Sequence, residues 1–176
     1  MDSLRLHWPE HLMEAAELGL YMFSACTFAT LLQHPASPLR HILADGLSRR
    51  AVMGLAMGAT VVAIVMTPWG KQSGGHFNPA ITFAFYRLGN VEFWDAVFYA
   101  VAQCVGAIGG VAVAGYLLRG APGNGAVRYA VTAPGAYGSA VAFVAELAIS
   151  FVLMATILVI TNRERLPPTL RISPVH

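Results

Sequence analysis

The chain has 176 residues, of which 56% are hydrophobic and 11% are charged. Charged residues make up about a quarter of an ordinary soluble domain, so this composition excludes one. The formal net charge is +2, with no run of basic residues to bind nucleic acid. The chain is therefore expected to be an all-α integral membrane protein.

Four long apolar runs carry the hydrophobic excess: Leu12–Leu32, Ala51–Thr67, Ala96–Leu118 and Ala140–Ile160. Each is close to the ~20 residues that a helix needs to cross a bilayer, so they predict four transmembrane spans. The first run is too long for a cleaved signal peptide and lacks a basic start. Both cysteines lie inside runs, so no disulfide framework is predicted.

A half-length apolar segment lies between the second and third spans. Asn78 is placed to cap a helix, and Pro79 suits the first helical position. The glycines Gly74 and Gly75 precede them and allow unusual backbone angles. A helix from Pro79 to about Leu88 would measure roughly 15 Å, half a bilayer core. Loop and helix together predict a re-entrant hairpin.

The stretch Gly74-Gly75-His76-Phe77-Asn78-Pro79-Ala80 resembles the first Asn-Pro-Ala signature of the aquaporins, the major intrinsic proteins. The resemblance implies a multi-pass channel, in the cell membrane by expectation, with a cytoplasmic amino terminus. It also implies a homotetramer with one pore per subunit. The lysines and arginines divide almost evenly between the two sides and do not contradict this orientation.

One motif recurs along the chain: Ala16-Glu17-Leu18 in the first span returns as Ala145-Glu146-Leu147 in the fourth. Channel folds often consist of two repeats. Residues 1–118 are therefore interpreted as a first repeat and 140–162 as the opening helix of a second. The polar, proline-rich stretch 163–176 is expected to be a tail. An aquaporin has six spans and two such hairpins, so 1–176 is interpreted as one partial aquaporin-like domain.

The resemblance assigns pore roles to the signature residues. The backbone carbonyls of Gly74, Gly75, His76 and Phe77 would accept hydrogen bonds from a passing solute. The Asn78 amide group would donate one, because its oxygen caps the helix. The positive end of the helix dipole would oppose cations and protons but not a neutral solute.

His76 is interpreted as a neutral residue that shapes the loop. The other five histidines lie in the lead, the external loop or the tail, so no metal site is predicted. A pH sensor at His76 is the alternative.

Glu17 and Glu146 each lie about two turns into a span, where a charge costs roughly 2.5–3.5 kcal/mol. In aquaporins the equivalent glutamates accept hydrogen bonds from the re-entrant loop backbone, so both are predicted to brace loops. A proton relay is the alternative. Glu14 lies nearer the interface and is expected to be solvated.

Met57 occupies the place on the second span where the family sets one wall of its constriction. Ordinary helix packing is an equally good interpretation of it. Small residues at four-residue spacing are interpreted as packing surfaces between helices. They are Gly54 and Gly58 on the second span, and Ala102, Gly106, Gly110 and Ala114 on the third.

The leading hypothesis is a channel that passes water, or another small neutral solute such as glycerol, by passive diffusion. No nucleophile–base pair or phosphate loop is present in the sequence, so no enzyme and no cofactor are predicted. The alternative is a truncated, non-conducting membrane fragment of such a channel. Because a second hairpin would supply half of the pore wall, the isolated 176-residue chain is expected to conduct poorly or not at all. A third hypothesis pairs copies inserted in opposite orientations.

Overall fold

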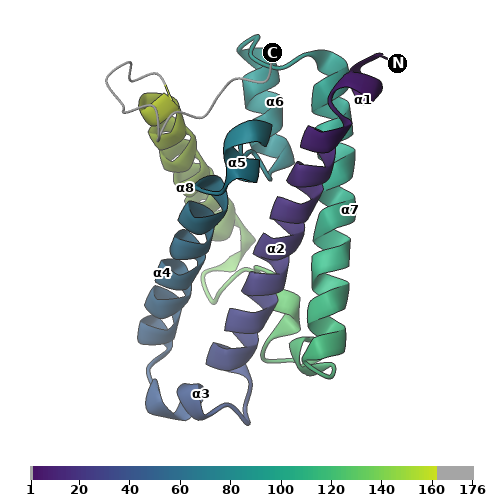
Figure 1. The fold of residues 1–176 in the computed structure, drawn as a ribbon. Coiled ribbons are helices and arrows are strands. Elements are labelled where there is room, and N and C mark those ends of the chain that lie inside the picture. Colours follow the sequence, from purple (N-terminus) through teal and green to yellow (C-terminus); the bar gives the residue numbers. More distant parts are fainter. Residues whose placement is uncertain (1, 162–176) are drawn as a thin grey trace. The chain divides into compact units, whose positions relative to one another are not determined.

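The computed structural model describes residues 2–161, which contain helices and no strand (Figure 1). The predicted tail 163–176 lies outside the described residues. The chain divides into two compact units, and the boundary in the sequence falls between Ala130 and Val131. Each unit is described by itself.

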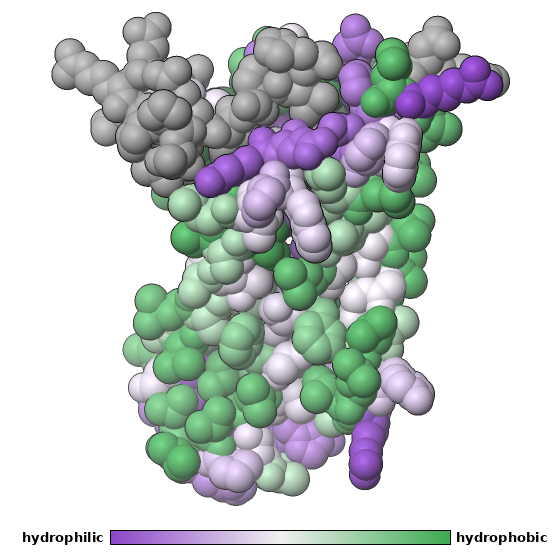
Figure 2. Space-filling model, viewed as in Figure 1, coloured by the Kyte–Doolittle hydropathy of each residue, from purple (hydrophilic) through white to green (hydrophobic). Residues whose placement is uncertain are grey.

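Three long helices form the frame of the first unit. They are α2 (Trp8–Gln33), α4 (Gly46–Val65) and α7 (Phe93–Leu117), and the second unit consists mainly of α8 (Gly138–Thr161). All four are long and apolar enough to cross a membrane, which confirms the four predicted spans. Apolar side chains cover the middle of the long helices and hydrophilic ones gather at their ends (Figure 2).

Short helices occupy stretches outside the four predicted spans and the predicted half-helix. They are α1 (Asp2–Leu6), α3 (Pro38–Ile42) and α5 (Pro68–Ser73), with the 3-10 turns η1 (Ala121–Gly123) and η2 (Arg128–Ala130). Proline is at the first position of α3 and α5, where its missing N–H is tolerated. Pro38 and Pro68 therefore each follow a long helix by a few residues and begin a short one.

The second span begins earlier than predicted, at Gly46 instead of Ala51. Asp45 is its N-cap: the carboxylate accepts hydrogen bonds from the Ser48 backbone N–H at 2.7 Å and from the Ser48 hydroxyl at 3.0 Å. These bonds lower the pKa of Asp45. The cap adds a polar first turn that the apolar run does not reveal.

The centre of the first unit is the contact between α2 and α7. A Cβ atom built on Gly106 would lie 1.9 Å from the Ala15 carbonyl oxygen, and one on Gly110 would lie 2.0 Å from that of Gly19. The helices therefore touch backbone to backbone, which confirms the predicted packing role of these α7 glycines. Gly54 and Gly58 on α4 have no described atom within 4 Å of a built Cβ.

Candidate functional site: the re-entrant loop and its supports

The re-entrant segment consists of α5, a five-residue loop and α6 (Pro79–Arg87) (Figure 1). Gly74 ends α5 with φ 94°, and Gly75 follows with φ 59°. These left-handed angles are strained for residues with a Cβ, so the glycine pair makes this reversal of the chain possible. Phe77 also has positive φ, at 25°. The loop is a tightly specified turn.

Asn78 caps α6, as the sequence predicts. Its side-chain oxygen accepts a hydrogen bond from the Ala80 backbone N–H at 2.9 Å, and Pro79 is the first helical residue. The helix has nine residues, about 14 Å at 1.5 Å per residue. It ends at Arg87, one residue before the predicted Leu88. Both Asn78 and Ala80 are exposed.

The loop leaves its own carbonyl groups available. Among residues 2–161, none of the four carbonyls of Gly74, Gly75, His76 and Phe77 accepts a hydrogen bond from the protein. The neighbouring carbonyls on either side do: Ser73 accepts from the Tyr99 hydroxyl at 2.8 Å, and Asn78 from the Thr82 backbone N–H at 3.0 Å. The loop therefore presents a short row of acceptors without partners.

Glu14 on α2 binds the backbone of the loop. Its carboxylate accepts the backbone N–H of His76 at 2.9 Å and of Phe77 at 2.6 Å. Gln103 on α7 donates a third hydrogen bond to it at 2.6 Å. Glu14 is completely buried, so the expectation that it is solvated is wrong. α2 contacts both α7 and α5 of the hairpin, and the hydrogen bonds of Glu14 place it on the face of α2 between them.

Glu17 reaches the loop by a different route. It accepts a hydrogen bond from the Ser73 hydroxyl at 2.9 Å, and that hydroxyl in turn accepts the Gly75 backbone N–H at 3.1 Å. Glu17 thus acts through the Ser73 side chain at the end of α5, whereas Glu14 accepts hydrogen bonds from the loop amides directly. The sequence predicts that Glu17 accepts the loop amides. In the structure Glu14, about one helical turn earlier on α2, accepts them.

His76 lies in a buried pocket of the loop. Its ring stacks on Phe85, with centroids 4.8 Å apart and planes 5° apart. The Nδ1 atom lies 3.2 Å from the Thr82 hydroxyl, which also accepts a hydrogen bond from Gln103 at 3.1 Å. The ring therefore fixes the loop against α6 and α7. Within the described residues no group of His, Cys, Asp and Glu has metal-binding geometry.

Three supporting residues escaped the sequence analysis: Tyr99 and Gln103 on α7, and Thr82 on α6. All three are buried and polar. Tyr99 and Gln103 are four residues apart and so share one helix face. Polar side chains at helical spacing inside an apolar run were the available signal.

The sequence of this chain matches the family model described as Major intrinsic protein over residues 6–176. The chain belongs to the major intrinsic protein family. It is 40% identical to Aquaporin-5 of Sus scrofa over 121 residues, which cover 65% of this chain and 41% of that protein. It is 31% identical to Probable aquaporin PIP2-8 of Oryza sativa subsp. japonica over 172 residues, covering 89% and 59%. No solved structure matches.

Membership of the major intrinsic protein family, together with the four apolar helices, identifies a multi-pass integral membrane protein. The aligned part of this chain spans between two fifths and three fifths of the two relatives.

Two further residues were singled out from the resemblance to this family. Met57 is buried on α4, with 9% of its surface exposed. Glu146 lies on α8, in the second unit, and its bracing role stays a prediction.

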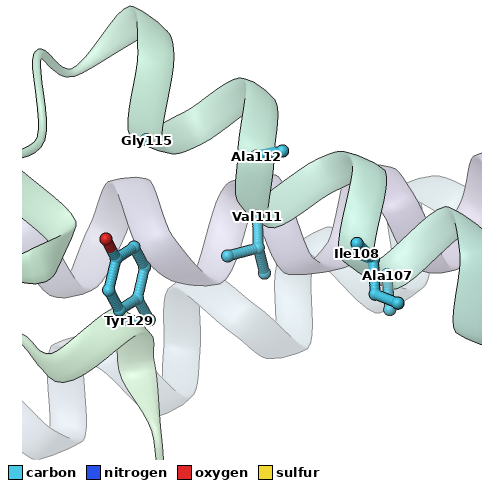
Figure 3. A pocket seen from close by; sticks show the side chains of 6 residues that line it. All are labelled: Ala107, Ile108, Val111, Ala112, Gly115 and Tyr129. Atoms are coloured by element: carbon cyan, nitrogen blue, oxygen red, sulfur yellow. The ribbon is translucent and has the colours of Figure 1, made fainter.

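A shallow pocket of about 550 Å³ also lies outside the loop. Figure 3 shows its lining: Ala107, Ile108, Val111, Ala112, Gly115 and Tyr129. These side chains are apolar apart from the Tyr129 hydroxyl, so the pocket has little chemistry to offer a polar ligand.

Proposed function

We propose that the chain forms a channel that conducts water or another small neutral solute by passive diffusion. The observation that carries the proposal is the loop geometry. Four carbonyls without protein partners run into a helix start capped by Asn78. Because the Asn78 oxygen is occupied by Ala80 N–H, its NH₂ group is free to donate. A solute with both acceptor and donor capacity, such as water, satisfies both sides.

The electrostatics of α6 support a neutral solute. A helix N-terminus carries the equivalent of about +0.5 elementary charge, and no acidic residue lies in the first turn of α6 to offset it. A cation or proton near Asn78 would therefore be repelled. Diffusion through such a site needs no cofactor and no catalytic group.

The names of the relatives also support a water channel, because both are called aquaporins. By the same family argument we propose a homotetramer, with one pore in each subunit. Crosslinking in native membranes, followed by mass determination, tests the assembly. A product of four chains is expected, and monomers alone would contradict it.

Met57 is our candidate for one wall of the constriction. Met57 and Ile64 are the buried residues of α4, so Met57 lies on the side of this helix that faces the protein and not the lipid. Met57→Ala is expected to raise the ratio of glycerol flux to water flux. An unchanged ratio would assign Met57 to packing.

The function is tested by shrinkage of proteoliposomes in an osmotic jump. If the chain conducts as proposed, vesicles that contain it shrink several-fold faster than protein-free vesicles, with an unchanged proton leak. Rates equal to those of protein-free vesicles, with correctly folded and inserted protein, would contradict the proposal.

The second candidate is a non-conducting membrane fragment. The observation that favours it is the exposure of the α6 start, at Asn78, Pro79 and Ala80. Within residues 2–161, one such half-helix is present, and we expect a complete pore wall to require a second. The same shrinkage assay decides between the two candidates.

A further inference from the structure

A compact polar cluster ties the amino-terminal segment to the start of α7. Asp95 lies in the first turn of α7 and is 3% exposed. Its carboxylate accepts a hydrogen bond from the Ser3 hydroxyl, and both of its oxygens lie 3.0 Å from His7 Nδ1. Residues 92 positions apart are thereby joined, and α1 is held against α7.

His11 lies beneath this cluster, one turn further along α2. It is 4% exposed, and neither ring nitrogen has a hydrogen-bond partner within the described residues. Its Nε2 is 3.5 Å from Asp95 Oδ1, the oxygen that Ser3 and His7 already contact. The ring packs instead against the aromatic rings of Phe98 at 5.5 Å and Tyr99 at 5.3 Å.

The titratable groups that act on His11 are Asp95 on α7, Glu10 on α2, and His7, which precedes α2. One oxygen of Glu10, Oε1, accepts a hydrogen bond from Gln72 on α5 at 2.9 Å, and its Oε2 has no partner within the described residues. Other titratable residues on the adjoining elements are Arg5 on α1, Glu14 on α2, Lys71 on α5, and Glu92 and Tyr99 at the start of α7.

A proton on His11 changes the energetics of this contact. The ring would gain a charge among aromatic side chains, and a buried charge is unfavourable unless it is hydrogen-bonded. The Asp95 carboxylate, 3.5 Å from Nε2, would attract this charge, but its nearer oxygen already has two hydrogen-bond partners, so the attraction offsets the burial of the charge only in part. The same ring in water takes up a proton near pH 6.5. Protonation therefore favours a conformation in which His11 is exposed.

We propose that His11 is a proton-sensitive latch, which docks residues 2–11 on α7 at neutral pH and releases them under acid conditions. The latch adjoins the re-entrant segment at two points. Glu10 contacts Gln72 on α5, and Tyr99, which packs on His11, donates to the Ser73 carbonyl. Release would loosen the support of the loop from the amino-terminal side.

The sign follows from linkage. The docked state binds the proton more weakly than the released state, so docking is complete above about pH 6.5 and weakens as the pH falls. The docking equilibrium changes by up to about tenfold for each pH unit below that value.

Hydrogen exchange of the amino-terminal peptide, measured by mass spectrometry on the full chain in lipid nanodiscs, tests the latch. After correction for intrinsic exchange, protection of residues 3–11 is expected to fall about tenfold between pH 7.5 and 5.5. Equal protection at both pH values would overturn the proposal. The readout requires no solute flux, so it stands or falls separately from the channel.

Variants identify the titrating group. His11→Phe keeps an aromatic ring without a proton site and is expected to stay docked at pH 5.5, and His11→Gln serves if phenylalanine is too large. His41→Gln is the matched control, because His41 contacts the Pro35 carbonyl at 3.0 Å, outside the cluster, and it should respond as the native chain does. A native response in both His11 variants, or loss of the response in His41→Gln, would overturn the assignment.

Discussion

Gln103 Nε2 lies 2.6 Å from Glu14 Oε2, and this contact joins α7 to the carboxylate that holds the re-entrant loop. The other two hydrogen bonds of Glu14 come from the backbone of His76 and Phe77. One buried side chain on α2 therefore connects the loop, its own helix and α7. This arrangement makes Glu14, more than Glu17, the residue on which the loop geometry depends.

Replacement of Glu14 should accordingly destabilise the folded protein more than replacement of Glu17. Glu14→Ala leaves the buried His76 N–H and the part-buried Phe77 N–H without their acceptor. The free energy of unfolding should fall by about 1–3 kcal/mol for the buried donor and by less for the other. Glu17→Ala removes one hydrogen bond to the Ser73 hydroxyl. We expect the midpoint of thermal unfolding in detergent to fall markedly further for Glu14→Ala. Equal midpoints would show that the backbone contacts of Glu14 contribute little.

The glycines of α7 provide a second test with an internal control. Gly110→Ala would place a Cβ 2.0 Å from the Gly19 carbonyl oxygen, so α2 and α7 must separate. Gly109→Ala meets no described atom within 4 Å and removes the conformational freedom of a glycine in a helix. We expect Gly110→Ala to lower the unfolding midpoint and Gly109→Ala to preserve or raise it. Similar behaviour of both would contradict the close helix contact.

Hydropathy predicts the four spans of this chain because each apolar run is long enough to cross a bilayer. The half-helix is also predictable, since Asn78 and Pro79 form a local capping signal that needs no tertiary contact. Helix caps that lie among polar residues, such as Asp45 before α4, were not predicted, because the hydropathy pattern does not mark a helix start in a polar stretch.

The supports of the loop are a different matter. Whether Glu14 or Glu17 faces the hairpin depends on how α2 is rotated against α7, and that rotation is set by the contacts of Gly106 and Gly110 with α2. The sequence lists both glutamates at a spacing that puts them on one face, but it does not state which of them reaches the amides. Gln103 and Thr82 become site residues through packing alone.

Tyr99 offers a test of one such packing contact. Its hydroxyl donates to the Ser73 carbonyl at 2.8 Å inside the protein, and Tyr99→Phe leaves this acceptor without its partner. The free energy of unfolding is expected to fall by about 1–3 kcal/mol. Tyr116→Phe is the control, because Tyr116 is 84% exposed, and it should leave the unfolding midpoint unchanged. An equally small effect at Tyr99 would mean that the Ser73 carbonyl finds another donor.

Asn78 combines a capping oxygen with a free amide group, and two substitutions separate these parts. Asn78→Asp keeps an oxygen for the Ala80 N–H, so the stability of α6 should be preserved. Asn78→Ala removes the cap and should lower the free energy of unfolding by about 1 kcal/mol. Asp also places a negative charge at the helix start, where it offsets the positive dipole. The proposed channel should then admit protons more readily in Asn78→Asp than in the native chain.

The measurement pairs thermal unfolding with proton leak in proteoliposomes. A stable Asn78→Asp protein with a raised leak and an Asn78→Ala protein of lower stability are the expected pair. If Asn78→Asp leaves the leak unchanged while the native chain conducts water, the field at the start of α6 is not what excludes protons. The barrier would then have to lie at a narrower point of the pore, for which Met57 is the available candidate.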